Sequence, residues 1–513
     1  MTGTTEATLA GHLLRADGQE DLCFASWRPS TGHQRLTSLI GQPIFPGPED
    51  RHVHGNVAFE PDYALRAAQE AAHGGAGLAF IHSHPGGRGW QGLNAIDRTA
   101  EARIANLARE ITGLPLVGMI LAGDRAWSAR VWDGVGREVV SQSCESVRVV
   151  GDTFVTTFND TLLPVPKISE TQVRTISTWG EKIQAAIARL RIAIAGAGSV
   201  GMIIADVLAR TGVQHVGVFD FDTVEMVNLD RLRGARRLDA VLKRSKIHVA
   251  RRLLAEASTA ARPSHAFHEL SICEPEGFAQ LLDYDIIFSC VDRPWPRHVI
   301  NTVAYADLIP IVEGGISAFQ NADGSFRNAY WSSTLVRPGR PCLACLRQYS
   351  PGMVQVERDG SLDDQSYIAN LPADSPARRR ENVAALSTSV AAALLQQFIV
   401  YIAHPSGFGD PGPLRFSLRD LGGDNGIERR TEVCTDDCPY PASVGCGDAR
   451  LDPVSRHRAA EDARRQRAGA SITVRAARRV DDLLWSLTQR LEGWARWPME
   501  REILKLPRPT EDH

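Results

Sequence analysis

Two histidines separated by a single residue have the spacing of a metal site. His82 and His84 follow the apolar run at residues 77–81, which predicts a strand. Because alternate side chains of a strand project from one face, both imidazoles should point the same way. With Asp97, at the start of a predicted helix, they could form a three-ligand zinc site that leaves one position for water. Such a metal lowers the pKa of its water to roughly 7, and a nearby carboxylate must then accept the proton.

The residues around His82 and His84 indicate whether this pair is a metal site or an incidental feature. His52 and His54 repeat the spacing with nothing else to recommend them, so a surface loop with incidental histidines is the alternative interpretation. Around His82, however, the chain resembles the JAMM (MPN-type) metallopeptidases over roughly residues 5–135. That family's signature is a distant glutamate, then His-x-His-Pro, then Ser-x-x-Asp. The resemblance implies a zinc peptidase.

The resemblance also assigns a base and an oxyanion donor. Glu20 precedes the predicted strand at residues 21–27, where the family places its general base. Asn94 stands where the family has the serine that helps to stabilise the oxyanion, after a loop longer than the usual one. An asparagine amide can also donate a hydrogen bond, so we expect reduced or retuned activity rather than none. Glu60, before a proline at a helix entrance, is the rival for the base.

A second group of residues has the pattern of a nucleotide site. A predicted strand at residues 191–195 runs into Gly196-Ala-Gly198-Ser-Val-Gly201, and a helix follows. In this arrangement backbone amides and the helix N-terminus can meet a phosphate. An acid about 20 residues further on is expected to hold the ribose hydroxyls, and Asp220 stands there. By itself this pattern would equally predict an NAD-binding dehydrogenase.

The residues that follow do not fit a dehydrogenase. They closely resemble the adenylation domain shared by ThiF, MoeB and the ubiquitin-activating enzymes, over about residues 170–440. That family binds ATP and magnesium through Asp-x-Asp, then Asn-Leu-x-Arg, a downstream lysine and an aspartate at a strand end. The matching residues in this chain are Asp220 and Asp222, Asn228 and Arg231, Lys246, and Asp292.

The resemblance implies a role for these side chains. Asp220 would bind the ribose, and Asp292 would bind magnesium near the reacting α-phosphate. The phosphates would be held by Asn228, Arg231 and Lys246. A solvated surface of charges is the alternative interpretation of these residues.

Adenylation explains why cations are needed here. A carboxylate that attacks the α-phosphorus meets negative charge, so cations and Mg²⁺ must neutralise the developing charge while pyrophosphate leaves. Arg174 lies ahead of the first strand, where the family has an arginine that reaches across a dimer to the triphosphate. The resemblance therefore implies a homodimer. Arg293 departs from the asparagine that is common in the family after the strand-end aspartate.

The cysteines cluster in the same part of the chain. Cys342 and Cys345 lie where the adenylation family has the first half of a structural zinc site, and Cys434 and Cys438 occupy the place of the second. Four thiolates make a closed tetrahedral site. The second pair has three intervening residues instead of two, so Cys446 is an alternative ligand.

One expected cysteine is missing. Ubiquitin-activating relatives carry a nucleophilic cysteine in the crossover segment after the Cys-x-x-Cys pair, but residues 346–403 contain none. We therefore predict that no thioester forms on this segment, and that the modifier passes to an external acceptor such as the cysteine of a conjugating enzyme. Cys446 is the alternative nucleophile for a thioester, because it lies between glycines and is not needed as a ligand if four other thiols hold zinc.

The predicted elements divide the chain into four parts, and the fold class is α/β multidomain. Residues 1–155 have the pattern of an α+β domain, and residues 156–170, with their prolines, that of a linker. Residues 171–447 alternate strands with helices, which predicts a Rossmann-like, mostly parallel sheet covered on both faces. Residues 448–513 form a basic, helical tail. The strands of the parallel sheet are expected at residues 191–195, 214–220, 285–290 and 308–313.

Composition excludes several other classes. The 513 residues, 43% of them hydrophobic and 23% charged, are those of an ordinary globular protein with two or three domains. The net charge of −3 favours neither nucleic acid nor an anionic membrane as a partner. The N-terminus has neither the basic start nor the apolar core of a secretory signal, so a cytoplasmic location is expected. Residues 384–403 approach membrane-spanning length, but serines and glutamines interrupt them, which predicts a buried helix.

The two resemblances together imply a bifunctional bacterial-type enzyme for a ubiquitin-like modifier. One half would use ATP, Mg²⁺ and a structural zinc to adenylate the modifier's C-terminal carboxylate. The JAMM half would trim a precursor or remove the modifier from its targets. The alternatives are an adenylyltransferase for a sulfur-carrier protein or short peptide in biosynthesis, and a scaffold in which both sites are degenerate.

Overall fold

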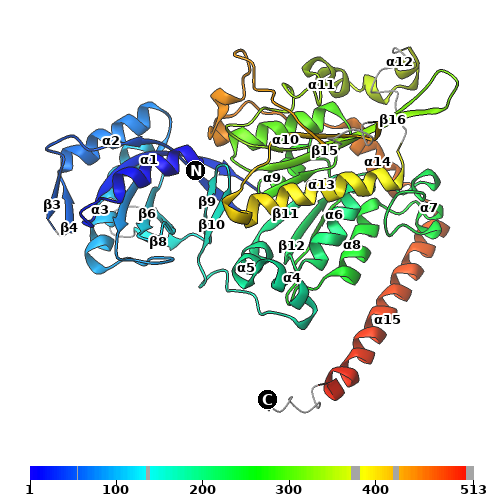
Figure 1. The fold of residues 1–513 in the computed structure, drawn as a ribbon, viewed down its shortest axis with the longest axis horizontal. Coiled ribbons are helices and arrows are strands. Elements are labelled where there is room, and N and C mark those ends of the chain that lie inside the picture. Colours follow the sequence, from blue (N-terminus) through cyan, green and yellow to red (C-terminus); the bar gives the residue numbers. More distant parts are fainter. Residues whose placement is uncertain (55, 135–138, 371–381, 420–426, 504–513) are drawn as a thin grey trace.

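The chain folds into two sheets with helices on their faces, which follow one another in sequence order (Figure 1). The computed structural model describes residues 1–54, 56–134, 139–370, 382–419 and 427–503. The two sheets confirm the α/β multidomain class that the sequence predicts.

The first sheet is mixed and has the strand order β2-β1-β5-β6-β7-β8. β5 and β6 are parallel, whereas the other neighbours are antiparallel. Alternate residues of β1 enter two separate cores, so that α1 covers one face of the sheet while α2 and α3 cover the other. The bounds are β1 Leu22–Thr31, β2 Leu36–Ile44, β5 Gly77–His84, β6 Leu116–Ala122, β7 Trp127–Asp133, β8 Val140–Ser143, α1 Gly3–Leu13, α2 Pro61–His73 and α3 Ala95–Thr112, with a separate hairpin of β3 Arg51–His54 and β4 Asn56–Phe59.

The second sheet has the order β13-β12-β11-β14-β15-β16-β17-β18. Its first neighbours, from β13 to β15, are parallel, and the remaining ones are antiparallel. The strands are β11 Arg191–Ala195, β12 His215–Phe219, β13 Ala266–His268, β14 Ile286–Ser289, β15 Ile311–Gln320, β16 Phe326–Val336, β17 Leu414–Ser417 and β18 Ile427–Arg429.

Helices cover both faces of this sheet, as the alternating pattern predicts. One face packs against α5, α6, α8 and α13, and the other against α9 and α10. The helices of this half are α4 Val173–Trp179, α5 Glu181–Arg189, α6 Ser199–Arg210, α7 Arg237–Val241, α8 Lys246–Ala257, α9 Pro275–Leu281, α10 Pro294–Ala306, α11 Pro351–Arg358, α12 Gln365–Asn370, α13 Ala384–Ala403, α14 Arg458–Ala468 and α15 Ile472–Ile503.

The fourth predicted strand of the parallel sheet differs from the structure. The first three agree to within one residue at each end, but β15 begins at Ile311 and runs to Gln320, not over residues 308–313. Leu308 has a φ of 53°, which no strand residue adopts, so the strand cannot include it. At the other end β15 is prolonged because it pairs antiparallel with β16. That pairing has no local sequence signal.

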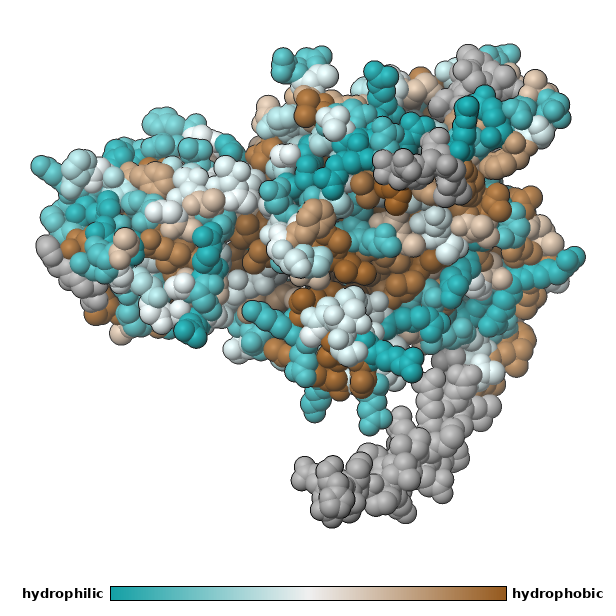
Figure 2. Space-filling model, viewed as in Figure 1, coloured by the Kyte–Doolittle hydropathy of each residue, from teal (hydrophilic) through white to brown (hydrophobic). Residues whose placement is uncertain are grey.

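Helix α13 is the apolar segment of near membrane-spanning length. By length and composition it could cross a membrane, and 56% of its apolar window is buried inside the molecule. It packs on α6, β15 and β16, where Gln397 donates a hydrogen bond to the carbonyl of Gly412 at 3.0 Å. Brown side chains lie along the middle of this face in Figure 2, where α13 crosses the second sheet in Figure 1. The helix therefore has the place of a buried core helix.

A hairpin joins the cores of the two halves. β9 Ser146–Val150 pairs with β10 Phe154–Phe158, so regular structure continues past the predicted domain boundary at residue 155. Val147 and Val149 enter the core of the first half, whereas Phe154 and Phe158 enter that of the second. Residues 156–158 of the predicted linker therefore belong to a hairpin that both halves share.

A buried carboxylate ties the two halves together. Asp285, just before β14, accepts hydrogen bonds from the guanidinium groups of Arg35 and Arg148, at 2.9 and 2.8 Å, and from the backbone amide of Arg191 at 2.8 Å. Burial alone would raise the pKa of Asp285, but the charges of the two arginines outweigh it and the pKa is lowered. Because both arginines come from the first half, this buried acid is one of the contacts that hold the two halves together.

Replacing Asp285 with alanine should destabilise the junction. Two buried arginines would lose their partner, which costs about 3–5 kcal/mol in the free energy of unfolding. The midpoint of urea unfolding, followed by tryptophan fluorescence, should fall accordingly. As a control, Asp160→Ala removes a carboxylate whose side chain is 67% exposed although it also pairs with an arginine, and it should cost no more than about 0.5 kcal/mol. Equal midpoints for the two variants would contradict this account.

Candidate functional site

The predicted ligands His82, His84 and Asp97 come together in the first half. The histidines end β5 on one face of the strand, and Asp97 lies in the first turn of α3. Oδ2 of Asp97 is 3.8 Å from Nε2 of His82 and 3.6 Å from Nε2 of His84. A zinc ion about 2.0–2.2 Å from each atom fits such separations. Three ligand atoms from these residues also lie within 4.8 Å of one another.

The polar atoms of this cluster lack other partners. His82 is 4% exposed, and neither of its ring nitrogens has a hydrogen-bond partner among the described residues; the same holds for Oδ2 of Asp97. Buried polar groups are rarely left unsatisfied, so an ion is the natural partner for these atoms. The residues present therefore fit a metal ion with nitrogen and oxygen ligands.

Glu20 and Asn94 lie beside this cluster. The pKa of His84 is raised by the nearby carboxylate of Asp97, against burial, and the charge of Glu20 adds to the shift, which places Glu20 within electrostatic reach. Asn94 caps α3, because its side-chain oxygen accepts a hydrogen bond from the amide of Asp97 at 2.8 Å. The side-chain NH₂ of Asn94 is then its hydrogen-bond donor. Glu60 instead pairs with His52 at 2.9 Å, on the β3–β4 hairpin.

The glycine-rich turn of the second half forms a phosphate cradle. Gly196 has a φ of 100°, and a Cβ there would lie 2.6 Å from the carbonyl oxygen of Cys290. A Cβ on Gly201 would lie 2.0 Å from the carbonyl oxygen of Gly196. Both glycines are therefore required by close packing of the backbone. Within the part of the chain that the structure describes, a Cβ on Gly198 would meet nothing within 4 Å, which leaves space in front of the N-terminus of α6.

Two acids and a lysine face this cradle. Oδ2 of Asp220 accepts a hydrogen bond from the amide of Ala197 at 2.8 Å, and Nζ of Lys246 lies 2.7 Å from Asp222 and 3.9 Å from Asp220. Burial raises the pKa of Asp220, which Lys246 only partly offsets. Burial alone would lower the pKa of Lys246, but the charges of Asp220, Asp222 and, more weakly, Asp292 raise it. The ammonium group therefore stays charged at neutral pH.

Other predicted phosphate ligands are bonded locally. Oδ1 of Asn228 accepts a hydrogen bond from the amide of Glu225 at 2.9 Å. Arg231 donates to the carbonyl of Val227 at 2.6 Å and to Asp230 at 2.7 Å. The structure thus brings Asp220, Asp222, Lys246 and Asp292 together but leaves the phosphate roles of Asn228 and Arg231 as predictions.

Arg174 lies away from the cradle of its own chain. It is in α4, a short helix ahead of the first strand of the parallel sheet, and its side chain is exposed. A role at the nucleotide of a partner chain remains a prediction.

Two acids near Asp292 have no signal in the sequence. Asp363 lies 2.7 Å from Nη1 of Arg293, and Glu357 accepts a hydrogen bond from the amide of Trp295 at 2.7 Å. Burial, only partly offset by that bond and by the charge of Arg293, raises the pKa of Glu357 to about 7. Because both acids lie more than sixty positions after Asp292, no local spacing could have found them. Arg293, where the family has asparagine, is thus held by an acid from the crossover segment.

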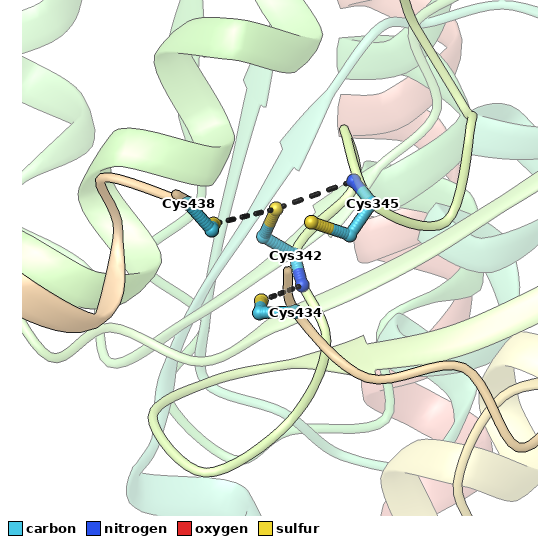
Figure 3. Close-up of side chains that lie close together, drawn as sticks. All are labelled: Cys342, Cys345, Cys434 and Cys438. Carbon is cyan, nitrogen blue, oxygen red and sulfur yellow. Dashed lines mark hydrogen bonds between the residues drawn. The ribbon is translucent and has the colours of Figure 1, made fainter. Parts of the chain in front are cut away.

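Four cysteines form a compact cluster at the end of the second half. In Figure 3 the sulfur atoms of Cys342, Cys345, Cys434 and Cys438 gather from two separate segments. All four lie within 4.8 Å of one another, and those of Cys342 and Cys438 are 3.6 Å apart. Tetrahedral zinc with Zn–S bonds of about 2.3 Å places its sulfurs roughly 3.8 Å apart. The residues therefore fit zinc, and the longer spacing between Cys434 and Cys438 does not prevent it.

Replacing Cys438 with serine should remove about one equivalent of zinc per chain, because one of four thiolate ligands is lost. Metal analysis of the purified full chain measures this directly. Cys446→Ser is the matched control: this thiol lies nearby in sequence but outside the cluster, and its loss should leave the zinc content unchanged. If Cys446→Ser lost the zinc and Cys438→Ser kept it, the assignment of the fourth ligand would be wrong.

Comparison with known proteins agrees with the geometry of the second half. The ThiF family model matches residues 170–414. Molybdopterin-synthase adenylyltransferase of Escherichia coli is 27% identical over 165 residues, or 32% of this chain and 61% of its own length. Ubiquitin-like modifier-activating enzyme 5 of Drosophila virilis is 30% identical over 165 residues, or 30% of this chain and 38% of its own. The chain thus spans less than two thirds of each of these relatives.

A solved structure shows a more distant likeness. The crystal structure of E. coli MccB with ATP aligns with 53% of this chain and 74% of its own, at 17% identity and a TM-score of 0.39, which is too distant to transfer the role of any residue. The family match, by contrast, includes the glycine-rich turn, both acids and the lysine described above. Residues 170–414, which carry the phosphate cradle, are therefore a ThiF-family domain.

Proposed function

We propose that the second half of this protein adenylates the C-terminal carboxylate of a small protein or peptide at the expense of ATP. The observation that carries the proposal is the placement of Lys246 between Asp220 and Asp222 in front of the Gly198 cradle. A cation fixed beside an open helix N-terminus is what a triphosphate requires. The ThiF-family match and the adenylating relatives support the same reaction.

The residues divide the work of the reaction. Asp220 lies at the end of β12, where it can accept hydrogen bonds from ribose hydroxyls. Lys246 can neutralise charge that develops on the phosphates as the carboxylate attacks and pyrophosphate leaves. Asp292, near the C-terminal end of β14, is the residue that would hold magnesium, which supplies further charge neutralisation when bound. Each group thus acts on charge that increases in the transition state.

The acyl substrate is the part for which several candidates remain. A ubiquitin-like modifier is the first, in line with the modifier-activating relatives, and a sulfur-carrier protein or a peptide is the second. We propose a homodimer in which the exposed Arg174 of one chain serves the nucleotide of the other.

The fate of the activated modifier follows from the cysteines. Residues 346–403 contain none, although residues 371–381 lie outside the described structure. Cys446 is half-buried, and burial together with the charge of Asp307 raises the pKa of Cys446. A thiol with a raised pKa is a poor nucleophile at neutral pH. We therefore propose transfer straight to an external acceptor, such as a conjugating enzyme.

We propose that the first half is a zinc peptidase that trims or removes the same modifier. The orphaned nitrogens of His82 beside Asp97 support this, together with the charge of Glu20 near His84. Zinc, when bound, would act as a Lewis acid that makes water nucleophilic. Glu20 would accept the proton of that water, and Asn94 would donate a hydrogen bond to the oxyanion of the cleaved carbonyl.

Asp292→Ala should reduce ATP–pyrophosphate exchange about 100-fold or more, because the transition state loses the charge neutralisation that magnesium provides. The assay uses the full chain with candidate ubiquitin-like proteins, sulfur carriers and peptides in turn. Asp462→Ala, which removes an exposed carboxylate on α14, is the control and should keep full exchange. Binding of NAD with no response to ATP would refute adenylation and restore the dehydrogenase interpretation.

The double variant His82→Ala, His84→Ala should lose about one equivalent of zinc and all cleavage of a linear or isopeptide-linked modifier. Glu20→Gln should keep the zinc and lose cleavage, because only the proton acceptor changes. The control is Glu60→Gln, whose carboxylate pairs with His52 and should not matter. Retention of zinc by the double variant would show that the zinc ligands are other residues. If Glu60→Gln lost cleavage and Glu20→Gln kept it, Glu60 and not Glu20 would be the general base.

A further inference from the structure

The last part of the chain packs against the segment that carries the nucleotide residues. We call residues 457–482, which include α14 and the start of α15, the C-terminal clip; residues 220–246, from Asp220 to Lys246, are the nucleotide segment. In Figure 1 α15 departs from beside α7, which belongs to the nucleotide segment. The ThiF-family match ends at residue 414, so the clip lies outside it.

Arg467 of the clip contacts one end of the nucleotide segment directly and is linked to the other end through Glu269. Its Nη1 donates a hydrogen bond to the carbonyl oxygen of Phe221, which stands between the acids Asp220 and Asp222. Its Nε lies 3.3 Å from Glu269, and the other carboxylate oxygen of Glu269 accepts a hydrogen bond from the hydroxyl of Ser245. Ser245 caps the helix that begins at Lys246. The guanidinium group of Arg467 thus links the backbone between Asp220 and Asp222 to the residue before Lys246, through Glu269.

A second set of contacts lies just before Lys246. Arg244, whose side chain is 6% exposed, is 2.9 Å from carboxylate oxygens of both Asp481 and Asp482 of the clip. In return Arg478 donates hydrogen bonds to the carbonyls of Leu242 and Lys243, at 2.9 and 2.8 Å. Lys243 has a φ of 45°, which is unusual for a residue with a side chain and needs outside support. These contacts fix the turn that leads into α8.

The clip also has contacts outside the nucleotide segment, with Ser271 and Glu274. Arg464 forms two hydrogen bonds with Glu274, at 2.8 and 2.6 Å. His457 is 5% exposed; its Nδ1 is 2.8 Å from the hydroxyl of Ser271, and its ring lies 5.1 Å from that of Phe221, edge to face. The contacts with Ser271 and Glu274 therefore fix the position of the clip relative to the nucleotide segment.

We propose that the C-terminal clip holds the nucleotide segment in the conformation that binds ATP, with Arg467 as the principal positioning residue. Within the segment, the amide of Lys246 donates to the carbonyl of Asp222 at 3.0 Å, and Thr223 forms an isolated bridge with Ser245. Arg467 contacts the side of Asp222 through the carbonyl of Phe221, and it is linked to the side of Ser245 through Glu269. Loss of the guanidinium would free the acids and the lysine to separate. The inference rests on the proposed adenylation, because it takes ATP as the ligand.

The test is calorimetric titration of the full chain with ATP and Mg²⁺. Arg467→Gln should weaken ATP binding about tenfold, because part of the binding energy must then order the segment. Arg467→Lys, which keeps a charged donor, should recover part of the affinity. Arg465→Gln is the matched control: it lies on the same helix with a side chain 67% exposed, and it should bind ATP as the unchanged chain does. Hydrogen exchange of residues 219–246 without nucleotide should be faster in Arg467→Gln and unchanged in Arg465→Gln.

The outcomes separate the clip from the proposed reaction. Arg467→Gln with normal ATP affinity would overturn the clip proposal even if its melting temperature fell, since its role would then be structural only. No ATP binding by the unchanged chain would overturn adenylation itself, and with it the ligand of the clip. If Arg467→Gln does not fold, the pair Asp481→Asn, Asp482→Asn, which releases Arg244, should show the same loss of affinity. Normal binding in that pair would then overturn the proposal.

Discussion

The shared carboxyl edge of the parallel strands is the constraint on which the second half depends. β11, β12 and β14 run in the same direction, so the glycine-rich turn, Asp220 and Asp292 all follow strand ends at this edge. Close packing of Gly196 and Gly201 allows the backbone to turn there without obstructing the space in front of α6. The acids can then hold Lys246 as a fixed cation beside that space. No single residue makes the site; the common direction of the strands does.

Buried charge also fixes the relation between the two halves. Asp285 lies at the opposite end of β14 from Asp292, and it pairs with arginines from the first half of the chain. A buried ion pair of this kind adds little to stability compared with an apolar contact, but removing one partner is costly. The pairing therefore specifies one arrangement of the two halves. The strand that carries the proposed magnesium ligand is, at its other end, the attachment point of the proposed peptidase.

The two candidate metal centres differ in how they are closed. The cysteine cluster offers four thiolates. A zinc ion bound by four thiolates has no position left for water, as expected of a structural ion. His82, His84 and Asp97 would supply three ligands to an ion, and a set of three would leave a fourth position for a reactant. The first set joins distant segments of the chain at the end of the ThiF-family domain. The second lies within one strand and the helix that follows, beside a carboxylate able to take a proton.

The sequence by itself determined the parts of this protein that depend on neighbours along the chain. The alternation of strand and helix predicted the parallel sheet, and short spacings located His82 with His84, the glycine-rich turn, and the two cysteine pairs. Such features follow from the period of a strand and from backbone conformations that only glycine adopts easily.

Contacts between distant residues were decided only by the tertiary structure. It extended β15 through its pairing with β16, brought Asp363 and Glu357 beside Asp292, and placed Cys438 rather than Cys446 with the other thiols. It also set the C-terminal arginines, which the sequence shows only as a basic tail, against the nucleotide segment. Their partners are carbonyls more than two hundred positions away and acids at a distance of 190 or more, and backbone carbonyls carry no sequence signal at all. Pattern and spacing specify local geometry, whereas the packing of the whole chain determines which local geometries meet.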